Sequence, residues 1–255
     1  MVSRVAITMG SDLQDAPGGI LRTRDMRLAS DSHHYIVLSY LHAWLEEQAL
    51  PQAKGILLDY GCGGQPYRAL FEPNITKYIG ADVAAAAGTK IDIQVEPEQP
   101  LPLSSESVDT ILSTQTLEHV PDFNFYLAEC QRLARPGGVL ILTAPMQWRH
   151  HEAPHDYWRF TRYGIRECLS RHGFEVGSIM ACGGVYALIG QIFLNHLVEH
   201  GIQRKIIIKA VNRLALRLDR MCQDQEDTLL WMCLAKKKSG LQVQPRWSGD
   251  SGRIS

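Results

Sequence analysis

The most informative stretch of this chain is Gly55-Ile56-Leu57-Leu58-Asp59-Tyr60-Gly61-Cys62-Gly63-Gly64. Three consecutive apolar residues lead to a carboxylate and then to clustered glycines, a pattern typical of a buried strand that enters a tight, ligand-facing turn. Glycine permits positive φ angles and leaves main-chain N–H groups open to a ligand, because it has no Cβ. The stretch therefore predicts a ligand that lies against backbone.

The same turn separates two classes of ligand. A dinucleotide fingerprint, Gly-x-Gly-x-x-Gly, uses its third glycine for close helix packing, but Pro66 stands at that position here. The carboxylate of Asp59 is unfavourable beside a diphosphate, whereas it would attract a ligand that carries an ammonium group. S-adenosylmethionine is such a ligand, so the turn favours it over a nicotinamide dinucleotide.

A second carboxylate ends the next predicted strand, Lys77-Tyr78-Ile79-Gly80-Ala81-Asp82, and follows Gly63 by 19 residues. In nucleotide-binding βαβ units an acid about 20 residues after the glycines binds the ribose hydroxyls. Asp82 therefore indicates an adenosyl ligand, a property shared by dehydrogenases and methyltransferases.

Strand and helix patterns alternate along the rest of the chain. An apolar stripe predicts a helix from Asp31 or Ser32 to Pro51, and further helices are expected from about Pro121 and from Thr161 to His172. Further strands are expected at 89–95, 107–112, 139–142, from 173 onward, and at 228–235. This alternation predicts an α/β fold with a doubly wound parallel sheet, whose ligand lies at the carboxyl ends of the strands.

Several segments resemble motifs of the class I S-adenosylmethionine-dependent methyltransferases. Leu57 to Gly64 closely resembles the first motif of that family, and Arg135 to Leu142 resembles its "L(K)PGG-L-I" motif. The run from Leu101 to Val120, which contains Leu117-Glu118-His119-Val120, is similar to the "LPF…SFD…LEHV" pattern of small-molecule members. Pro154 to Thr161 resembles a "PHDYWRYT" segment of bacterial members. The resemblance extends over about residues 55–182 and weakly over 227–235.

The resemblance implies a Rossmann-like sheet with strand order 3-2-1-4-5-7-6 and an antiparallel strand 7. It also implies transfer of a methyl group from S-adenosylmethionine to an oxygen, less commonly a nitrogen, of a small molecule such as a sugar or natural product. Two alternatives stay open at this point. One is an NAD-dependent Rossmann oxidoreductase, and the other is a non-catalytic methyltransferase-like partner subunit.

The resemblance also assigns roles to individual residues. It implies that the ligand at the carboxyl ends of the strands, where Asp59, Asp82 and Gln115 fall, is S-adenosylmethionine. Glu96 is the residue expected to meet the adenine amino group. The cofactor-binding residues expected on this basis are Asp59, Gly61, Cys62, Gly63, Asp82, Val83, Glu96 and Gln115.

The segment after strand five is rich in aromatic and histidine residues and is expected to form the wall of the acceptor site. Trp148, Tyr157 and Trp158 are the expected acceptor-contacting residues. His155 is predicted to be the general base with Asp156 as its orienting partner, and His119 is the second choice. The cluster of His150, His151, Glu152, His155 and Asp156 offers metal-binding side chains, but its spacing matches no zinc pattern, so a metal-free acceptor pocket is predicted ahead of a metal site.

Composition narrows the function further. The formal charge of −1 provides no general attraction to nucleic acid and favours a small-molecule acceptor. The six cysteines form no C-x-x-C pair and no signal peptide is evident, which together predict a cytoplasmic protein. No apolar run reaches the roughly 18 residues that a membrane-spanning helix needs.

The chain divides into three parts. Residues 1–30 predict a flexible arm, residues 31–236 a methyltransferase domain, and residues 237–255 a disordered tail. Within the domain, residues 185–222 predict a helical insertion between the last two strands, broken near Gly201. This insertion suits a cap over the acceptor site or a homodimer surface. Its cations suit a solvated helix face or peripheral contact with a membrane.

Overall fold

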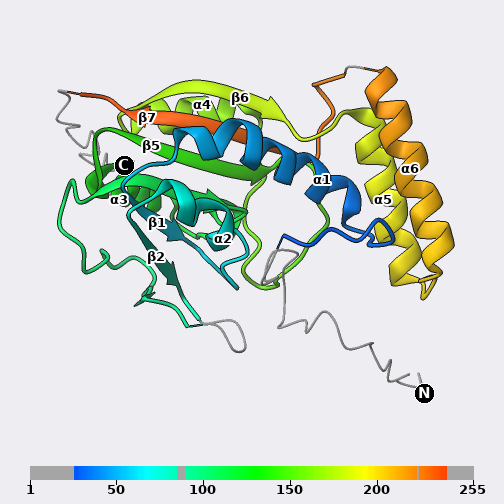
Figure 1. The fold of residues 1–255 in the computed structure, drawn as a ribbon, viewed down its shortest axis with the longest axis horizontal. Helices are drawn as coiled ribbons and strands as arrows, with labels where there is room; N and C mark the ends of the chain where they lie inside the picture. Colours follow the sequence, from blue (N-terminus) through cyan, green and yellow to red (C-terminus); the bar gives the residue numbers. More distant parts are fainter. Residues whose placement is uncertain (1–25, 85–89, 223, 240–255) are drawn as a thin grey trace, which may run out of the picture.

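The computed structural model describes residues 26–84, 90–222 and 224–239. Seven strands form one sheet with the order β3-β2-β1-β4-β5-β7-β6 (Figure 1). Neighbouring strands from β3 to β5 pair in parallel, whereas β7 is antiparallel to both β5 and β6. The predicted strand order and the antiparallel seventh strand are therefore confirmed. The strands are β1 (Ile56–Tyr60), β2 (Lys77–Asp82), β3 (Ile93–Gln94), β4 (Val108–Thr114), β5 (Ala134–Pro145), β6 (Phe174–Ala181) and β7 (Leu230–Lys237).

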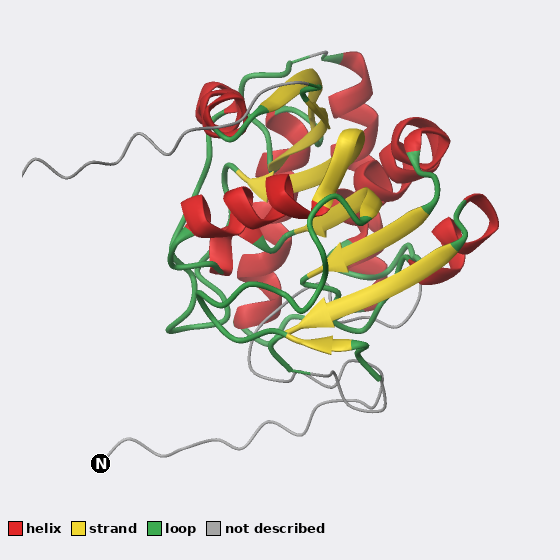
Figure 2. Cartoon of the chain, turned by 90° about the vertical axis from the view of Figure 1, so that its left-hand side faces the viewer, coloured by secondary structure: helices red, strands yellow, loops and turns green. Residues whose placement is uncertain are grey.

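Helices cover both faces of the sheet (Figure 2). One hydrophobic core contains residues of α1 (Tyr35–Trp44), α5 (Val185–Glu199) and α6 (Lys205–Met221), and Phe71 of the short helix α2 (Arg68–Phe71). The other contains residues of α3 (Phe123–Leu133) and α4 (Arg162–Arg171). Successive strand residues point to opposite faces, so Leu57 enters the first core and its neighbour Leu58 the second.

The first helix begins later than the sequence indicated. Neither Asp31 nor Ser32 is its N-cap, because α1 starts at Tyr35. The Ser32 hydroxyl instead accepts a hydrogen bond from the His34 N–H at 3.2 Å, within the turn that precedes the helix. The expected apolar stripe is buried, and the helical path continues through a π-helical turn (Leu45–Ala49) and a 3-10 turn (Leu50–Gln52) around Pro51.

Two other boundaries differ from expectation, and one agrees. The helix expected from about Pro121 begins at Phe123, after the N-cap Asp122, whose carboxylate accepts hydrogen bonds from two main-chain N–H groups of the first turn. The strand expected at 89–95 is reduced to the two residues of β3, and part of that range lies outside the described residues. Thr161 caps α4 as predicted, through a bond from the Gly164 N–H.

Both ends of the packed domain reach beyond the predicted limits. Met26 and Leu28 pack against the first core, and the Asn212 amide donates to the Ser30 carbonyl oxygen at 3.1 Å. Residues 26–30 are therefore part of the domain rather than of a flexible arm. At the other end, Lys237 belongs to β7 and its ammonium donates to the Ala134 carbonyl oxygen at 2.9 Å. The remaining arm, 1–25, and most of the tail, 240–255, lie outside the described residues.

The predicted insertion is a hairpin of α5 and α6 at one end of the sheet (Figure 1). The two helices approach closely, because a Cβ at Gly190 would lie 2.5 Å from the Ala215 Cβ. Buried Asp219 of α6 accepts hydrogen bonds from the Tyr40 hydroxyl of α1 and from the Ala187 N–H of α5, at 2.6 and 2.9 Å. In the described part of the chain, no helix has the length and apolar character needed to cross a membrane.

Candidate functional site

The glycine turn at the end of β1 is tied to β2 by main-chain hydrogen bonds. The N–H groups of Gly61 and Cys62 both donate to the Ala81 carbonyl oxygen, at 2.8 and 3.1 Å. Gly61 has a φ of +88°, and a Cβ there would lie 2.3 Å from side-chain atoms of Thr116. The turn therefore requires glycine both for its backbone conformation and for the close approach of the loop after β4.

Asp82 connects the end of β2 to the same turn. Its Oδ2 accepts a hydrogen bond from the Gly63 N–H at 2.7 Å. The Ala84 N–H contacts the other oxygen only weakly, at 3.4 Å, so Oδ1 keeps acceptor capacity. The next residue, Val83, is half exposed at this edge of the sheet. Asp82, the residue predicted to bind the ribose hydroxyls, therefore lies directly beside the glycines.

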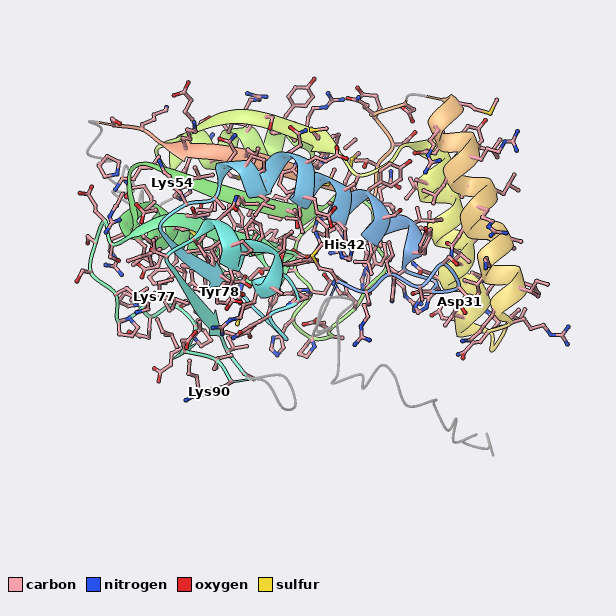
Figure 3. All side chains as sticks on the ribbon, in the orientation of Figure 1. Asp31, His42, Lys54, Lys77, Tyr78 and Lys90 are labelled. Carbon is pink, nitrogen blue, oxygen red and sulfur yellow. The ribbon has the colours of Figure 1, made fainter. Side chains whose placement is uncertain are left out.

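Asp59 is buried beneath the turn and incompletely satisfied. The Tyr78 hydroxyl donates to its Oδ2, while its Oδ1 has no hydrogen-bond partner. Burial, together with the nearby charge of Asp82, raises the pKa of Asp59 to about 7, against the lowering effect of the Tyr78 hydrogen bond. Tyr78 lies on β2, next to α2 (Figure 3), and the Arg68 guanidinium lies 5.1 Å above its ring. A positively charged group near the turn would therefore stabilise ionised Asp59.

Two other predicted cofactor residues, Gln115 and Glu96, lie at the same edge. The Gln115 side chain is hydrogen-bonded within the protein, whereas Glu96 is exposed. Gln115 follows β4 with a φ of +53°, and its side-chain amide donates to the Thr143 hydroxyl of β5 at 3.1 Å. Its amide NH₂ is thus already engaged within the protein. Glu96 lies exposed after β3, next to Val95, whose N–H donates to the Asp82 carbonyl oxygen at 2.8 Å.

The loop after β5 folds back onto a short 3-10 turn (Leu117–His119) that follows β4. The N–H groups of Tyr157 and Trp158 both donate to the Glu118 carbonyl oxygen, at 2.9 and 3.2 Å. The Trp158 indole N–H donates to the Val120 carbonyl oxygen at 2.9 Å. These bonds present two partly exposed aromatic rings beside the turn. Trp148 packs instead against the first core, with its ring 6.3 Å from that of His34.

Asp156 is paired with a different histidine from the one expected. Its carboxylate binds the Arg159 guanidinium at 2.6 and 2.8 Å and lies 3.3 Å from the His151 Nδ1. Burial alone would raise the pKa of Asp156, but the Arg159 and His151 contacts outweigh it and hold that pKa at about 2. His155 is exposed, and its Nδ1 lies 3.1 Å from the Tyr157 hydroxyl. The expected pairing of Asp156 with His155 is thus not the one in the structure.

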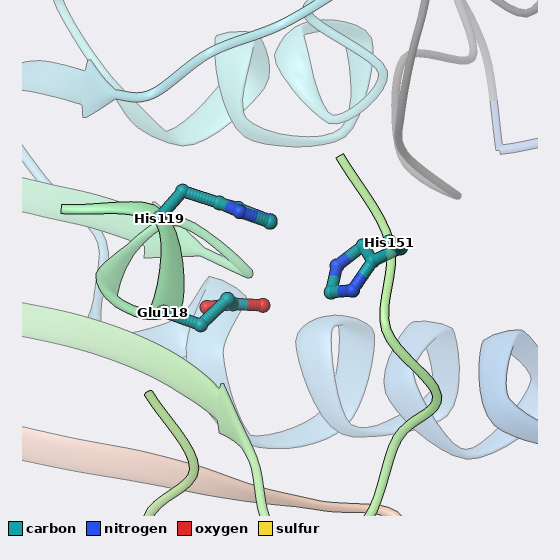
Figure 4. Close-up of side chains that lie close together, drawn as sticks. All are labelled: Glu118, His119 and His151. Carbon is teal, nitrogen blue, oxygen red and sulfur yellow. The ribbon is translucent and has the colours of Figure 1, made fainter. Parts of the chain in front are cut away.

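The turn after β4 and the loop after β5 bring together Glu118, His119 and His151 (Figure 4). One ligand atom of each side chain lies within 4.8 Å of the other two, and the two imidazole rings are 4.7 Å apart. Burial raises the pKa of Glu118 to about 8, and neither of its carboxylate oxygens has a hydrogen-bond partner. Burial, then the charge of His119, lowers the pKa of His151.

The sequence placed Glu118 in the Leu117–Val120 motif and His151 in the histidine-rich loop, but neither was predicted as a site residue. The place of Glu118 directly after the fourth strand was a usable signal, because that edge of the sheet carries the ligand. His151 had no such signal, since three histidines share its loop and their spacing does not distinguish them.

Residues 58–142 match the methyltransferase domain family. This third of the chain is therefore similar to methyltransferase domains. The match covers the glycine turn and the Glu118–His119 turn, whereas the loop after β5 lies beyond it. Both turns lie at the carboxyl edge of the parallel strands.

Relatives of the methyltransferase domain include a ubiquinone biosynthesis O-methyltransferase of Sinorhizobium medicae (strain WSM419). It is 32% identical over 100 residues, which are 34% of this chain and 39% of that protein. The chain thus matches about two fifths of the length of this curated relative.

Two solved structures share the fold of the methyltransferase domain. The cyclase SpnF has a TM-score of 0.54 and 20% identity, covering 80% of this chain and 82% of its own. A SAM-dependent methyltransferase from Archaeoglobus fulgidus has a TM-score of 0.52 and 14% identity, covering 81% and 95%. Because the identities are low, these two similarities establish the fold alone.

The methyltransferase domain implies S-adenosylmethionine as the cofactor, and the residues present fit it. The Oδ1 of Asp82 can still accept a hydrogen bond from a ribose hydroxyl. The Oδ1 of buried Asp59 has no partner, and its negative charge would attract a cationic ligand. Gly63 is partly exposed and has no side chain, so a ligand can approach the main chain of the turn there.

Proposed function

We propose that this protein transfers a methyl group from S-adenosylmethionine to an oxygen of a small-molecule acceptor. One observation carries the proposal: Asp59 and Asp82 end neighbouring strands on either side of a glycine turn, and the Gly63 N–H binds Asp82 at 2.7 Å. This arrangement suits a ligand with both a ribose and a positive charge. A nicotinamide dinucleotide would instead bring a diphosphate toward two carboxylates.

The residues of the turn would act mainly by orientation. When bound, S-adenosylmethionine supplies an electrophilic methyl group. Asp82 would hold the ribose hydroxyls and Asp59 would favour the cationic end of the cofactor through its negative charge. Val83 and Glu96 would border the adenine, with Gln115 at the far side of the turn. Alignment of acceptor and methyl carbon then supplies a large part of the rate.

The acceptor would lie at the turn after β4 and the loop after β5. Exposed Tyr157 and Trp158, fixed by their bonds to the Glu118 carbonyl oxygen, present flat apolar surfaces for a ring-shaped acceptor such as a sugar or natural product. The name of the relative from Sinorhizobium medicae supports an oxygen acceptor. His155, next to Tyr157, is the proposed base for the hydroxyl proton, with His119 as the second candidate.

Calorimetry with S-adenosylhomocysteine and with NAD tests the cofactor. Losing a charge-assisted hydrogen bond costs about 1.5–3 kcal/mol, so Asp82→Ala should weaken S-adenosylhomocysteine binding roughly ten- to a hundredfold. Asp92→Ala is the matched control, because the Asp92 carboxylate binds the Gly80 N–H on the same strand. Preference for NAD, or equal binding by the Asp82 variant, would contradict the proposal.

Methyl transfer to a panel of hydroxylated acceptors tests the reaction. Single-turnover rates of His155→Ala and His119→Ala at saturating cofactor should identify the base, whose loss typically lowers the rate by about 10²–10⁴-fold. If the protein binds cofactor and transfers methyl to none of the acceptors, the non-catalytic partner-subunit alternative is favoured instead.

A further inference from the structure

Glu118 is a fully buried carboxylate with no hydrogen-bond partner for either oxygen. An isolated buried charge costs several kcal/mol, so such a group is either neutral or compensated by a cation. Its backbone is held in place, because its carbonyl oxygen accepts from the N–H groups of Tyr157 and Trp158. The turn that carries Glu118 is therefore fixed, while its buried carboxylate has no hydrogen-bond partner from another residue.

Arg159 does not supply a hydrogen-bond partner for the Glu118 carboxylate. Arg159 influences Glu118 electrostatically, but its guanidinium is committed to the Asp156 carboxylate and to the carbonyl oxygens of Trp148 and Arg149. The groups that do face the Glu118 carboxylate are the imidazoles of His119 and His151 (Figure 4).

Both imidazoles are held in the same orientation by their Nδ1 atoms. The His119 Nδ1 lies 2.7 Å from the His155 carbonyl oxygen. The His151 Nδ1 lies 3.2 Å from the Arg149 carbonyl oxygen and 3.3 Å from the Asp156 carboxylate. Carbonyl and carboxylate oxygens only accept, so each ring carries its proton on Nδ1 and has a lone pair on Nε2. Fixing the far ring nitrogen in this way is the usual support of metal-binding histidines.

We propose that Glu118, His119 and His151 bind a divalent first-row transition-metal ion, with Asp156 as the residue that positions His151. Two imidazoles and one carboxylate form a ligand set that leaves coordination positions open. Their ligand atoms lie within 4.8 Å of one another, so small side-chain shifts bring them around one ion. The ion would supply the positive partner that the buried Glu118 carboxylate lacks.

The consequence for chemistry rests on the proposed function. A metal ion at this turn would bind an acceptor hydroxyl and lower its pKa. The hydroxyl proton would pass to His155, the oxygen lone pair would form the bond to the methyl carbon, and the sulfur would keep the electrons of the broken carbon–sulfur bond. In this arrangement His119 is a ligand and not the base.

Cobalt(II) titration of chelator-treated, cofactor-free protein tests the site, because the visible absorption of bound Co²⁺ reports its ligands without any activity. Wild-type protein should bind one equivalent. Glu118→Gln, His119→Ala and His151→Ala should each lose more affinity than the roughly 10- to 100-fold expected for Asp156→Asn. His150→Ala is the matched control, since His150 is the exposed neighbour of His151 and should not change Co²⁺ binding.

Absence of Co²⁺ binding, or equal binding by all of these variants, would overturn the inference. Thermal unfolding of each metal-free variant checks the fold, and Glu118→Gln should keep it because glutamine has nearly the same shape and brings no charge into the core. S-adenosylhomocysteine binding separates the two proposals. If wild-type protein binds S-adenosylhomocysteine but not Co²⁺, only the metal site is contradicted. If it binds Co²⁺ but not S-adenosylhomocysteine, only the proposed function is contradicted.

Discussion

Gly61 is the residue at which the cofactor turn is most constrained. Its φ of +88° is unfavourable for any side chain, and Thr116 occupies the space that a Cβ would need. Asp59 lies two residues before it, buried and with one oxygen unpartnered. Gly61 thus has a constrained backbone, and Asp59, two residues earlier, has a raised pKa. Each property can be tested separately.

Replacing Gly61 with alanine should remove S-adenosylhomocysteine binding and destabilise the protein. A left-handed conformation costs an alanine about 1–2 kcal/mol, and the clash with Thr116 adds to that. Gly137→Ala is the matched control, because Gly137 has a φ of +72° with no atom within 4 Å of the added Cβ. Calorimetry and urea unfolding of both variants compare the effects. Equal losses would mean that the approach of Thr116 is unimportant.

Asp59 predicts a specific dependence of stability on pH. Its pKa is raised to about 7 in the folded protein from an ordinary value of 3.8, so the folded state holds this proton more tightly than the unfolded state. As pH rises between these values, the unfolded state loses its proton first, and the wild type is destabilised by up to about 1.4 kcal/mol per pH unit.

The Asp59→Asn variant lacks this titration. Its stability relative to wild type should therefore increase as pH rises toward about 7 and stay constant above that value. Urea unfolding of both cofactor-free proteins across this range measures the difference. A stability difference that does not change with pH would show that Asp59 has an ordinary pKa.

Among the helices, α3 connects the Glu118–His119 turn to the second core. Its N-cap residue, Asp122, follows that turn by three residues and accepts hydrogen bonds from the Asn124 and Phe125 N–H groups at 2.9 and 3.1 Å. Leu127, Cys130 and Leu133 then bury one face of the helix against the sheet. The cap thus defines where the irregular turn ends and regular structure begins.

Asp122→Ala should lower the free energy of unfolding by about 1 kcal/mol, because two main-chain N–H groups lose their partner. Asp122→Asn keeps a side-chain oxygen and should retain most of that stability. Urea denaturation of the two variants distinguishes capping from a general charge effect. If both lose stability equally, the negative charge and not the hydrogen bonds would be responsible.

At the scale of the whole molecule, Asp219 joins the inserted hairpin to α1, which packs on the sheet. Its buried carboxylate accepts from Tyr40 on α1 and from the Gly184 and Ala187 N–H groups at the start of α5. These contacts connect parts of the chain separated by up to 179 residues. The hairpin is therefore an integral part of the first core.

Asp219→Ala should destabilise the whole protein by on the order of 3 kcal/mol, because three donors lose one charged acceptor. Arg217→Ala, an exposed change on the same helix, should have little effect. Thermal unfolding should show a single transition at lower temperature for Asp219→Ala. A separate early transition would mean that the hairpin unfolds independently of the sheet.

The sequence by itself determined the alternation of strands and helices, the glycine turn and the position of the ligand edge. These features follow from local patterns: apolar runs define strands, glycines define the turn, and parallel strands place Asp59 and Asp82 at the same edge. The cap of α4 at Thr161 was likewise visible, because a capping side chain binds an N–H only three residues away.

Only the tertiary structure decided which side chains meet at the acceptor edge. Asp156 pairs with His151 and not with adjacent His155, because the loop after β5 bends to bind the Glu118 carbonyl oxygen through Tyr157 and Trp158. The same bonds bring His151 to Glu118, 33 positions earlier in the chain. Side-chain direction in an irregular loop depends on such distant contacts, and no local periodicity encodes them.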